Sequence, residues 1–377
     1  NKHKKILLEK VKEANFLVIG GAGSIGQAVC KEIFKRQPLK LHVIDISENN
    51  LVELVRDLRS SFGYIKGEFK TFAIDCASVE FEVFFKYQSS YDYILNLSAL
   101  KHVRSEKDPY TLMRMVHTNV FSVLNTIKLA ESKKVKKYFC VSTDKAANPV
   151  NLMGASKKIM EMFLNNYSKK IMISSARFAN VAFSDGSLLH GLNQRIIKRQ
   201  PISAPFDIKR YFVSSSEAGQ LCLMSCLLGE TNDIFFPKES KELQLTDFTS
   251  IISLYLKQKG FETFLCNHED EAREKCNELI EKKLWPCYFF KSDTTGEKPF
   301  EEFYTKEEKV SFEKFENIGI VKNNIEFDVE KLDKFYYEIN LMRQKMDWDK
   351  TKILQQISCL LPEFDYKELN KNLDQSM

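Results

Sequence analysis

A short apolar stretch that runs directly into a cluster of glycines restricts the fold of this chain more than any other feature. Residues 16–19 read FLVI and lead into GGAGSIG, and a helix is predicted from 27 to 36. Backbone amides at the start of a helix bind a pyrophosphate when no side chain blocks its approach. We therefore predict a dinucleotide-binding turn rather than a chance glycine turn. Its residues are Gly20, Gly23, Ser24, Ile25 and Gly26.

The second predicted strand, residues 41–44, ends at Asp45. A carboxylate at this place accepts hydrogen bonds from an adenosine ribose and repels a 2′-phosphate. No arginine follows directly, because residues 46–49 read ISEN. We therefore expect the cofactor to be NAD rather than NADP, with Asp45 and Ser47 among its contacts.

Strands and helices alternate six times up to about residue 180, which is typical of a doubly wound parallel sheet of the Rossmann type. Ligands of such sheets bind at the carboxyl ends of the strands. Further cofactor contacts are therefore expected where strands end, at Asp75, Cys76, Leu97, Ala99 and Ser142. For Asp75 two roles stay open: a hydrogen bond to the adenine amine, or the N-cap of a helix from Ala77 onward.

The fifth predicted strand, residues 138–141, ends in Ser142-Thr143-Asp144-Lys145, and a helix of roughly 153–167 carries Lys157. A hydroxyl, a carboxylate and an ammonium group thus leave the ligand-binding edge of the sheet together. The layout resembles the active site of short-chain dehydrogenases with one position changed. Most of those enzymes have a tyrosine four residues before the helix lysine, whereas this chain has Met153, which cannot take a proton.

Composition excludes several other classes of protein. The chain has 377 residues and a formal net charge of +5, and its basic residues form no basic helix or aromatic-interleaved groove, so we expect no nucleic-acid partner. No run approaches 18 apolar residues and residues 1–12 do not look like a secretion signal, so we expect no membrane segment. The nine cysteines show no CxxC pair or zinc spacing, which predicts no metal site and favours free thiols in the cytoplasm.

Beyond residue 180 the alternation of strands and helices loosens. We expect a NAD-binding domain with the catalytic residues at 1–180, a smaller α/β substrate-binding region at 181–327, and a helical tail at 328–377. The helices predicted at 110–132 and 153–167 are expected to pair across a two-fold axis, as in related enzymes, which makes the protein a homo-oligomer, a dimer or larger.

Five stretches carry a specific resemblance: GGAGSIG, STDKAANPVNLMGASK, RFANVAFSDGS, RYF and TGEKPFEEF. Together they resemble the CapD-like family of polysaccharide biosynthesis, which are NAD-dependent nucleotide-sugar 4,6-dehydratases of the extended short-chain dehydrogenase/reductase superfamily. The resemblance covers about residues 6–321. Many relatives carry N-terminal membrane helices, and this chain is similar to the soluble subgroup. Its longer stretch 266–291 is similar to the dehydratase of legionaminic acid synthesis. That similarity implies GDP-linked N-acetylglucosamine, and the UDP-linked sugar stays open.

The resemblance also implies roles for the polar residues after the fifth strand. Asp144 would protonate the departing C6 hydroxyl and Lys145 would remove the C5 proton. We expect burial to raise the pKa of Asp144 and to lower that of Lys145. Thr143 would bond the C4 oxygen, and Lys157 the nicotinamide ribose. A proton relay from Thr143 would replace the missing tyrosine, and Met153 would pack against the sugar.

The nucleotide-sugar contacts are carried over from the same motifs. Besides Thr143 and Met153 they are Lys101, His102, Asn180, Arg210 and Glu297. An arginine suits a diphosphate because its guanidinium presents a planar fork of donors. For Arg177 a packing or salt-bridge role is equally open, and for Arg195 we favour a solvated surface position.

Two other classes of function stay open. A nucleotide-sugar C4-epimerase or reductase would share the fold, but these enzymes usually use the tyrosine that is absent here. A non-catalytic dinucleotide-binding protein would have no reason to keep Asp144, Lys145 and Lys157 together.

Overall fold

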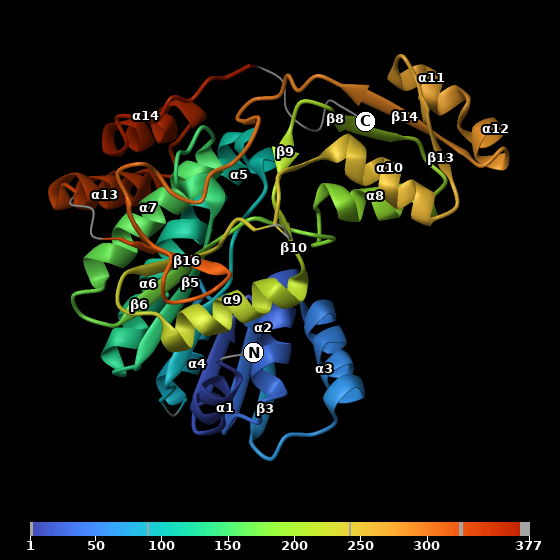
Figure 1. The fold of residues 1–377 in the computed structure, drawn as a ribbon. Helices are drawn as coiled ribbons and strands as arrows, with labels where there is room; N and C mark the ends of the chain where they lie inside the picture. Colours follow the sequence, from blue (N-terminus) through green and yellow to red (C-terminus); the bar gives the residue numbers. More distant parts are fainter. Residues whose placement is uncertain (1–2, 89, 241–242, 324–326, 370–377) are drawn as a thin grey trace. The chain divides into compact units, whose positions relative to one another are not determined.

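The computed structural model of the chain describes residues 3–88, 90–240, 243–323 and 327–369 (Figure 1). Its residues divide into two compact units. The first unit comprises Asn1–Phe178, Ser215–Lys238 and Glu302–Asp365, and the second comprises Ala179–Ser214, Glu239–Glu301 and Tyr366–Met377. The expected contiguous division at 180 and 327 therefore differs from the structure. The chain leaves and re-enters the first unit more than once, and most of the expected tail belongs to that unit, except that residues 370–377 lie outside the described residues.

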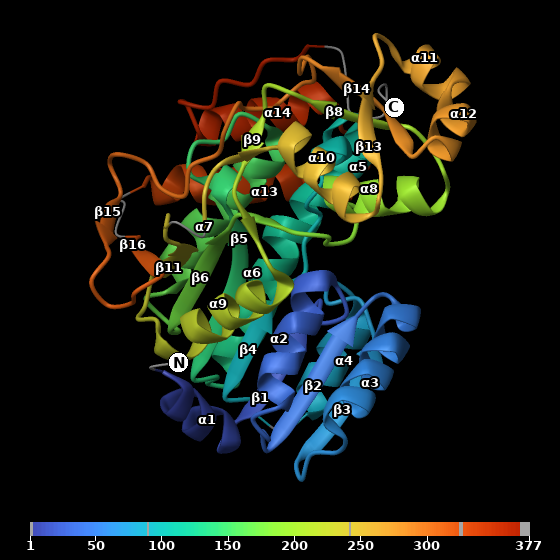
Figure 2. The ribbon, with the colours of Figure 1, turned by 45° about the vertical axis from the view of Figure 1, so that its right-hand side comes forward.

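The first unit is built on a nine-stranded sheet, which Figure 2 shows together with its helices. Seven neighbouring strands run parallel, so the predicted doubly wound parallel sheet is confirmed. An antiparallel pair extends the sheet beyond them. In spatial order the strands are β3 (Glu68–Ala73), β2 (Lys40–Asp45), β1 (Asn15–Ile19), β4 (Tyr93–Asn96), β5 (Lys137–Thr143), β6 (Ile173–Phe178), β11 (Asp233–Pro237), β16 (Ile318–Lys322) and β15 (Lys309–Ser311).

Several helices of the first unit begin where a side-chain oxygen accepts a first-turn amide. Ser47, Ser78, Asp108 and Asn151 act in this way for α3, α4, α5 and α7. Ser78, and not Asp75, therefore caps the helix that follows β3. The helices are α1 (Lys4–Lys12), α2 (Ser24–Phe34), α3 (Glu48–Phe62), α4 (Val79–Tyr87), α5 (Pro109–Val116), α6 (Ser122–Ser132), α7 (Leu152–Tyr167), α9 (Ser215–Leu228), α13 (Val329–Lys345) and α14 (Lys350–Leu360).

The single helix predicted at 110–132 is divided in the structure. A π-helical turn, His117–Phe121, separates α5 from α6. Such turns are rare and frequently lie at functional sites. The turn contains Asn119, whose fully buried amide bonds the backbone of Leu100 rather than its own helix.

The C-terminal helices pack on the outer face of this helical layer. The ring of Tyr336 on α13 stacks on Phe121 with centroids 5.0 Å apart, and it also meets Phe163 of α7 edge-on. From the segment before α14, Trp348 donates its indole N–H to the Pro109 carbonyl at 3.1 Å. The chain's own tail thus covers part of the surface on which a two-fold pairing was expected. The homo-oligomer stays a prediction.

The second unit has a small parallel sheet of its own, in the order β13–β14–β8. Its core gathers around the buried Trp285 together with Ile252 and Leu256. The elements are β7 (Asn180–Val181), α8 (Leu188–Ile197), β8 (Ile202–Pro205), β9 (Lys209–Arg210), β10 (Phe212–Val213), β12 (Thr246–Asp247), α10 (Phe248–Gln258), β13 (Glu262–Leu265), α11 (Glu269–Glu274), α12 (Cys276–Glu281) and β14 (Leu284–Phe290). The long stretch 266–291 therefore supplies two short helices and the central strand of this sheet.

No helix among the described residues combines the length and apolar character needed to cross a membrane. Within the same residues, no three His, Cys, Asp or Glu side chains group as ligands for a metal ion.

Candidate active site

The glycine turn between β1 and α2 has the close backbone packing that its sequence predicts. Gly20 has a φ of +71°, and a Cβ there would lie 2.6 Å from the backbone nitrogen of Ser98. A Cβ on Gly26 would lie 2.3 Å from the Gly20 carbonyl oxygen. At Gly23 the nearest atom would be 3.7 Å away, so this position leaves room above the backbone. Glycine is thus required at 20 and 26 because a side chain would collide with the protein's own backbone. At Gly23 the absence of a side chain leaves the start of α2 open to a ligand.

The start of α2 has the properties of an anion-binding helix end. Gly23 stands at the N-cap, and within the described part of the chain no side chain caps the helix. The partly exposed Gly23, Ser24 and Ile25 form its beginning. Amides at a helix N-terminus attract phosphate oxygens. These residues therefore fit the pyrophosphate of a dinucleotide.

Asp45 lies at the end of β2 beside the same turn. One of its carboxylate oxygens accepts the Ala22 amide at 2.9 Å and the other accepts the Ser47 amide at 2.9 Å. Each oxygen keeps a second lone-pair direction, so the carboxylate is held in place and can still accept ribose hydroxyls. Asp45 thus fits its expected role.

The other predicted cofactor residues lie at the exits of β3 and β4. Asp75 is exposed and its carboxylate accepts the Ala77 amide at 2.9 Å. The thiol of Cys76 is buried 3.7 Å from the Ser98 hydroxyl, and burial raises its pKa to about 11. Leu97 and Ala99 are half-buried just after β4. The edge of the sheet therefore assembles most of the predicted set.

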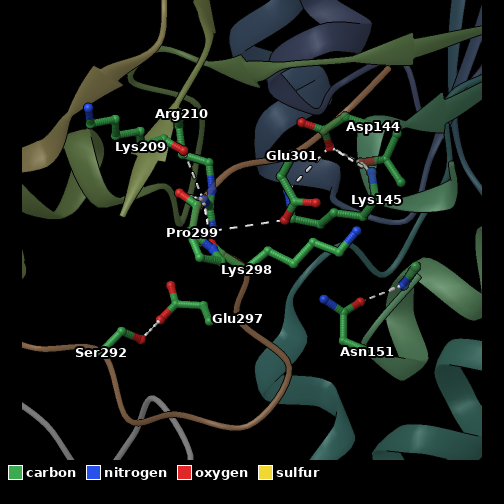
Figure 3. Close-up of polar contacts among 12 residues, drawn as sticks. Asp144, Lys145, Asn151, Lys209, Arg210, Ser292, Glu297, Lys298, Pro299 and Glu301 are labelled. Carbon is green, nitrogen blue, oxygen red and sulfur yellow. Dashed lines mark hydrogen bonds and ion pairs between the residues drawn. The ribbon is translucent and has the colours of Figure 1, made fainter. Parts of the chain in front are cut away.

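Asp144 is the centre of the polar cluster that follows β5. Its Oδ1 accepts the Lys145 amide at 2.9 Å and the Lys145 ammonium at 3.3 Å (Figure 3). The same oxygen accepts the Thr143 hydroxyl at 2.9 Å. The carboxylate is almost fully buried, whereas the Lys145 side chain is 16% exposed. A buried carboxylate that collects three donors is fixed in position, and the partly exposed ammonium beside it stays reachable.

Lys157 on α7 lies below this cluster and is buried. Its ammonium donates to the Val141 carbonyl at 3.1 Å, and burial lowers its pKa although Cys140 and Glu161 oppose that change. Met153, one turn earlier, is 3% exposed, and its amide donates to Glu106 at 2.8 Å. The position that holds a tyrosine in most short-chain dehydrogenases thus contains no ionisable group.

Asn119 connects the loop after β4 with the start of α7. Its amide nitrogen donates to the Leu100 carbonyl and to the Ser156 hydroxyl, each at 3.0 Å, and its oxygen accepts the Leu100 amide at 3.0 Å. The Ser156 hydroxyl in turn donates to the Met153 carbonyl. Asn119 falls within the helix predicted at 110–132, and no role was predicted for it from the sequence. The π-helical turn that points its side chain toward Leu100 and Ser156 is not visible in the sequence pattern.

Arg177, at the end of β6, is the centre of a second, fully buried network. It donates two hydrogen bonds to Glu161 of α7 at 2.7 and 2.9 Å, and two to Glu308 at 2.6 and 2.7 Å. Burial opposes the charge, but both carboxylates raise the pKa of Arg177. The Ser142 hydroxyl donates to Glu161 at 2.6 Å. Arg177 therefore has the salt-bridge role of the two left open, and Ser142 turns its hydroxyl toward this network.

The predicted substrate residues of the second unit are tied into its own backbone (Figure 3). Arg210 is 5% exposed and donates to the carbonyls of Lys298 at 2.9 Å and Pro299 at 3.3 Å. Glu297 accepts the hydroxyls of Ser292 and Thr294. Asn180 pairs through its backbone with Tyr211. Arg210 and Glu297 therefore shape the loop that carries TGEKP, and direct contacts with a nucleotide sugar stay predictions.

Three other predicted positions lie at the surface. Lys101 and His102 follow β4 and are exposed. Partial desolvation lowers the pKa of His102, and the positive charges of Lys101 and Arg104 lower it further. Arg195 bonds Gln200 in an exposed position, as favoured. Glu161 and Glu308 were not predicted from the sequence. The one indication of them was Arg177, whose charge would need acidic partners if it were buried.

The chain is similar to several known proteins. A family described as "Polysaccharide biosynthesis protein" matches residues 16–323. The uncharacterized membrane protein MJ1061 of Methanocaldococcus jannaschii is 31% identical over 82% of this chain and 86% of its own length. The capsular polysaccharide biosynthesis protein CapD of Staphylococcus aureus is 28% identical over 64% of this chain but only 41% of CapD. The UDP-N-acetylglucosamine 4,6-dehydratase (inverting) of Campylobacter jejuni is 26% identical, over 65% of this chain and 72% of that enzyme.

Solved structures share the fold. Pen from Bacillus thuringiensis superimposes with a TM-score of 0.67 at 22% identity, covering 89% of this chain and 98% of Pen. The dTDP-glucose 4,6-dehydratase DesIV from Streptomyces venezuelae has a TM-score of 0.57 at 14% identity, covering 73% of this chain and 85% of DesIV. With the family match over most of the chain, these findings show that the chain belongs to the polysaccharide biosynthesis protein family, the CapD-like branch of the extended short-chain dehydrogenase/reductases that includes nucleotide-sugar dehydratases.

Proposed function

We propose that this protein is a NAD-dependent 4,6-dehydratase that acts on a nucleotide-linked N-acetylglucosamine and forms its 4-keto-6-deoxy derivative. The observation that carries the proposal is the Thr143-Asp144-Lys145 cluster at the exit of β5, combined with the buried Met153 where a tyrosine is usual. An acid and a base side by side suit the loss of water across two neighbouring carbons.

The chemistry needs proton handling at three positions of the sugar. The C5 hydrogen becomes acidic only when C4 is a ketone, because the carbanion is then an enolate. NAD, when bound, supplies the redox chemistry by accepting a hydride from the sugar and giving it back. All proton transfers are left to the side chains of this chain.

The hydrogen bond from Thr143 to Asp144 supports a route for these protons. The C4 hydroxyl proton passes through Thr143 to the Asp144 carboxylate, which then donates it to the departing C6 oxygen. Lys145, in its neutral form, takes the C5 proton and returns it to C5. The balance is the loss of one water, with no proton required from Met153.

The identity of the nucleotide is part of the proposal. The Campylobacter jejuni relative acts on the UDP-linked sugar according to its name. The resemblance of stretch 266–291 to the legionaminic acid enzyme favours the GDP-linked sugar. We therefore propose both as candidate substrates, with a role in bacterial surface glycan or nonulosonic acid synthesis in the cytoplasm.

A C4-epimerase is the second candidate. Relatives named UDP-glucose 4-epimerase, such as that of Rickettsia bellii, are 28% identical over 60% of this chain. Epimerisation at C4 needs a group that removes and returns the C4 hydroxyl proton, and Met153 cannot do so. It does not use an acid–base pair directed at C5 and C6.

Mass spectrometry of the products from UDP- and GDP-N-acetylglucosamine, with NMR of the sugar to show its configuration at C4, separates these functions. A dehydratase gives a product that has lost the mass of one water, without added cofactor being consumed. An epimerase gives a product of unchanged mass with the galacto configuration. No reaction with either sugar would contradict both functions.

A further inference from the structure

Residues 298–308, here called the linking segment, contain the point at which the chain passes from the second unit into the first. The middle stretch of the second unit, Glu239–Glu301, ends there, and the first unit resumes at Glu302. The segment has no helix or strand, and β15 begins only at Lys309. It includes most of TGEKPFEEF, the motif to which the proposed chemistry gives no role. Its course is therefore set by side-chain contacts.

A buried arginine holds the second-unit end of the linking segment. Arg210 donates to the carbonyls of Lys298 and Pro299, and its guanidinium lies 3.8 Å from the Glu301 carboxylate. Arg210 and Glu301 are 5% exposed each. The Lys209 amide adds a bond to the Pro299 carbonyl at 2.8 Å. Because Lys209 and Arg210 both belong to β9, this end of the linking segment is held by the second unit.

A second buried arginine holds the first-unit end. Arg177 donates to the Phe303 carbonyl at 2.9 Å and binds the Glu308 carboxylate through two bonds. Glu308 also accepts the Thr305 amide at 2.9 Å. The ring of Phe303 stacks on Phe236 of β11. This end is therefore fixed to the central sheet.

The first-unit end also reaches both ends of the catalytic loop, residues 142–148. Arg177 and Ser142 bind the same oxygen of Glu161, at 2.9 and 2.6 Å. At the other end of the loop, Asn148 donates directly to Glu302 at 2.9 Å. Asp144 and Lys145 lie between these two attachments.

We propose that the linking segment couples the occupancy of the second unit to the position of Asp144 and Lys145, with Arg177 and Glu308 as positioning residues. The proposal rests on the proposed function, since it assigns substrate binding to the second unit. A change at residues 298–301 on nucleotide binding is transmitted through Phe303 and Glu308 to the Ser142 end of the catalytic loop, and through Glu302 to its Asn148 end. Small displacements of catalytic groups change rates strongly. A linking segment that no longer holds the catalytic loop in position should therefore slow turnover.

Inserting two glycines between Glu301 and Glu302 tests the coupling without removing a buried charge. We expect kcat on the nucleotide sugar that the wild type dehydrates to fall about tenfold or more, with KM and bound NAD within about twofold of wild type. The matched control inserts two glycines between Asp365 and Tyr366, another passage between the units, and is expected to keep kcat. An unchanged kcat in the first variant, or an equal loss in both, overturns the proposal.

Amide hydrogen exchange gives a readout independent of turnover. We expect saturating UDP or GDP, whichever binds, to slow exchange at residues 142–148 in the wild type and in the control insertion, but not in the 301/302 insertion. Unchanged exchange in the wild type overturns the coupling even if the enzyme is active. A wild type that binds nucleotide and shows the slowed exchange but dehydrates neither sugar would instead overturn the proposed function alone.

Discussion

The Lys145 ammonium lies 3.3 Å from Oδ1 of Asp144, the same oxygen that accepts the Thr143 hydroxyl at 2.9 Å. The acid, the base and the proposed relay thus meet at one oxygen atom at the end of β5. This arrangement makes it necessary to separate the contributions of the two charged groups by experiment.

Lys145→Met and Asp144→Asn are expected to stop the reaction at different steps. Without Lys145, the C5 hydrogen should no longer exchange with solvent deuterium. Asp144→Asn should instead slow the oxidation of C4, because an amide cannot accept the proton that Thr143 relays. Lys145→Met should still oxidise C4, so reduced cofactor should accumulate in Lys145→Met and not in Asp144→Asn. General acid–base groups contribute about 10² to 10⁴ in rate, so both variants should keep measurable traces of activity. Absorbance of the reduced cofactor, together with deuterium incorporation followed by mass spectrometry, checks this. Wild-type C5 exchange in Lys145→Met would assign the base to another residue.

Asp45→Ala is expected to purify with much less bound NAD than the wild type. The carboxylate holds the Ala22 and Ser47 amides and keeps acceptor capacity for the ribose, so its loss removes both the contact and the support. Cofactor released by denaturation and quantified by absorbance measures the effect. The control is Glu53→Ala, which removes an exposed carboxylate from α3 and should keep wild-type cofactor content. Equal NAD content in Asp45→Ala and the control would show that the ribose binds elsewhere.

Glu308→Gln is expected to lower the free energy of unfolding by about 3–5 kcal/mol at neutral pH, because it leaves the buried Arg177 charge partly uncompensated. Glu307→Gln, at an exposed neighbouring position, should change it by less than about 0.5 kcal/mol. Burial opposes ionisation of Glu308, but Arg177 lowers its pKa below the ordinary 4.5.

This pKa shift sets the pH dependence of the Glu308 effect. A depressed carboxyl pKa stabilises the fold above 4.5, and that stabilisation disappears as the pH falls through the native value. The difference between wild type and Glu308→Gln in urea unfolding should therefore shrink on acidification below pH 4.5. A difference that stays constant there would mean that packing, and not charge, is lost in the variant.

We expect the free energy of unfolding to rise with pH in alkaline solution because of Lys137. Its ammonium is buried and donates to the carbonyls of Ser225 and Gly229 at the end of α9. Burial lowers its pKa to about 8, outweighing the opposite effects of Cys226 and Asp233. The native state therefore binds fewer protons than the unfolded state between pH 8 and about 10, and stability rises with pH there. Thermal unfolding at pH 7.5, 8.5 and 9.5 measures this.

The comparison is with Lys137→Met, which should lack this rise, and with Lys136→Met, which removes an exposed neighbour and should keep it. Parallel curves for wild type and Lys137→Met would show that the ammonium titrates normally. They would also mean that water reaches the Lys137 ammonium.

The sequence by itself determined the features that depend on neighbouring residues. The spacing of Gly20, Gly23 and Gly26 predicted the turn, since a Cβ on Gly20 or Gly26 meets backbone at under 3 Å. The alternation of strands and helices predicted the parallel sheet. Asp144 and Lys145 are adjacent in the chain, so the sequence placed an acid and a base together at the end of one predicted strand.

Only the tertiary structure decided the features whose partners are distant in the chain. Arg177 was open between a ligand contact and a salt bridge until Glu308, 131 residues later, was brought to it. The π-helical turn at Asn119 depends on the Leu100 backbone and Ser156, and the return of residues 302–365 to the first unit depends on contacts that no local pattern reveals. A buried charge or amide needs a partner, but burial is a property of the whole fold, so the sequence indicates the need and the tertiary structure supplies the partner.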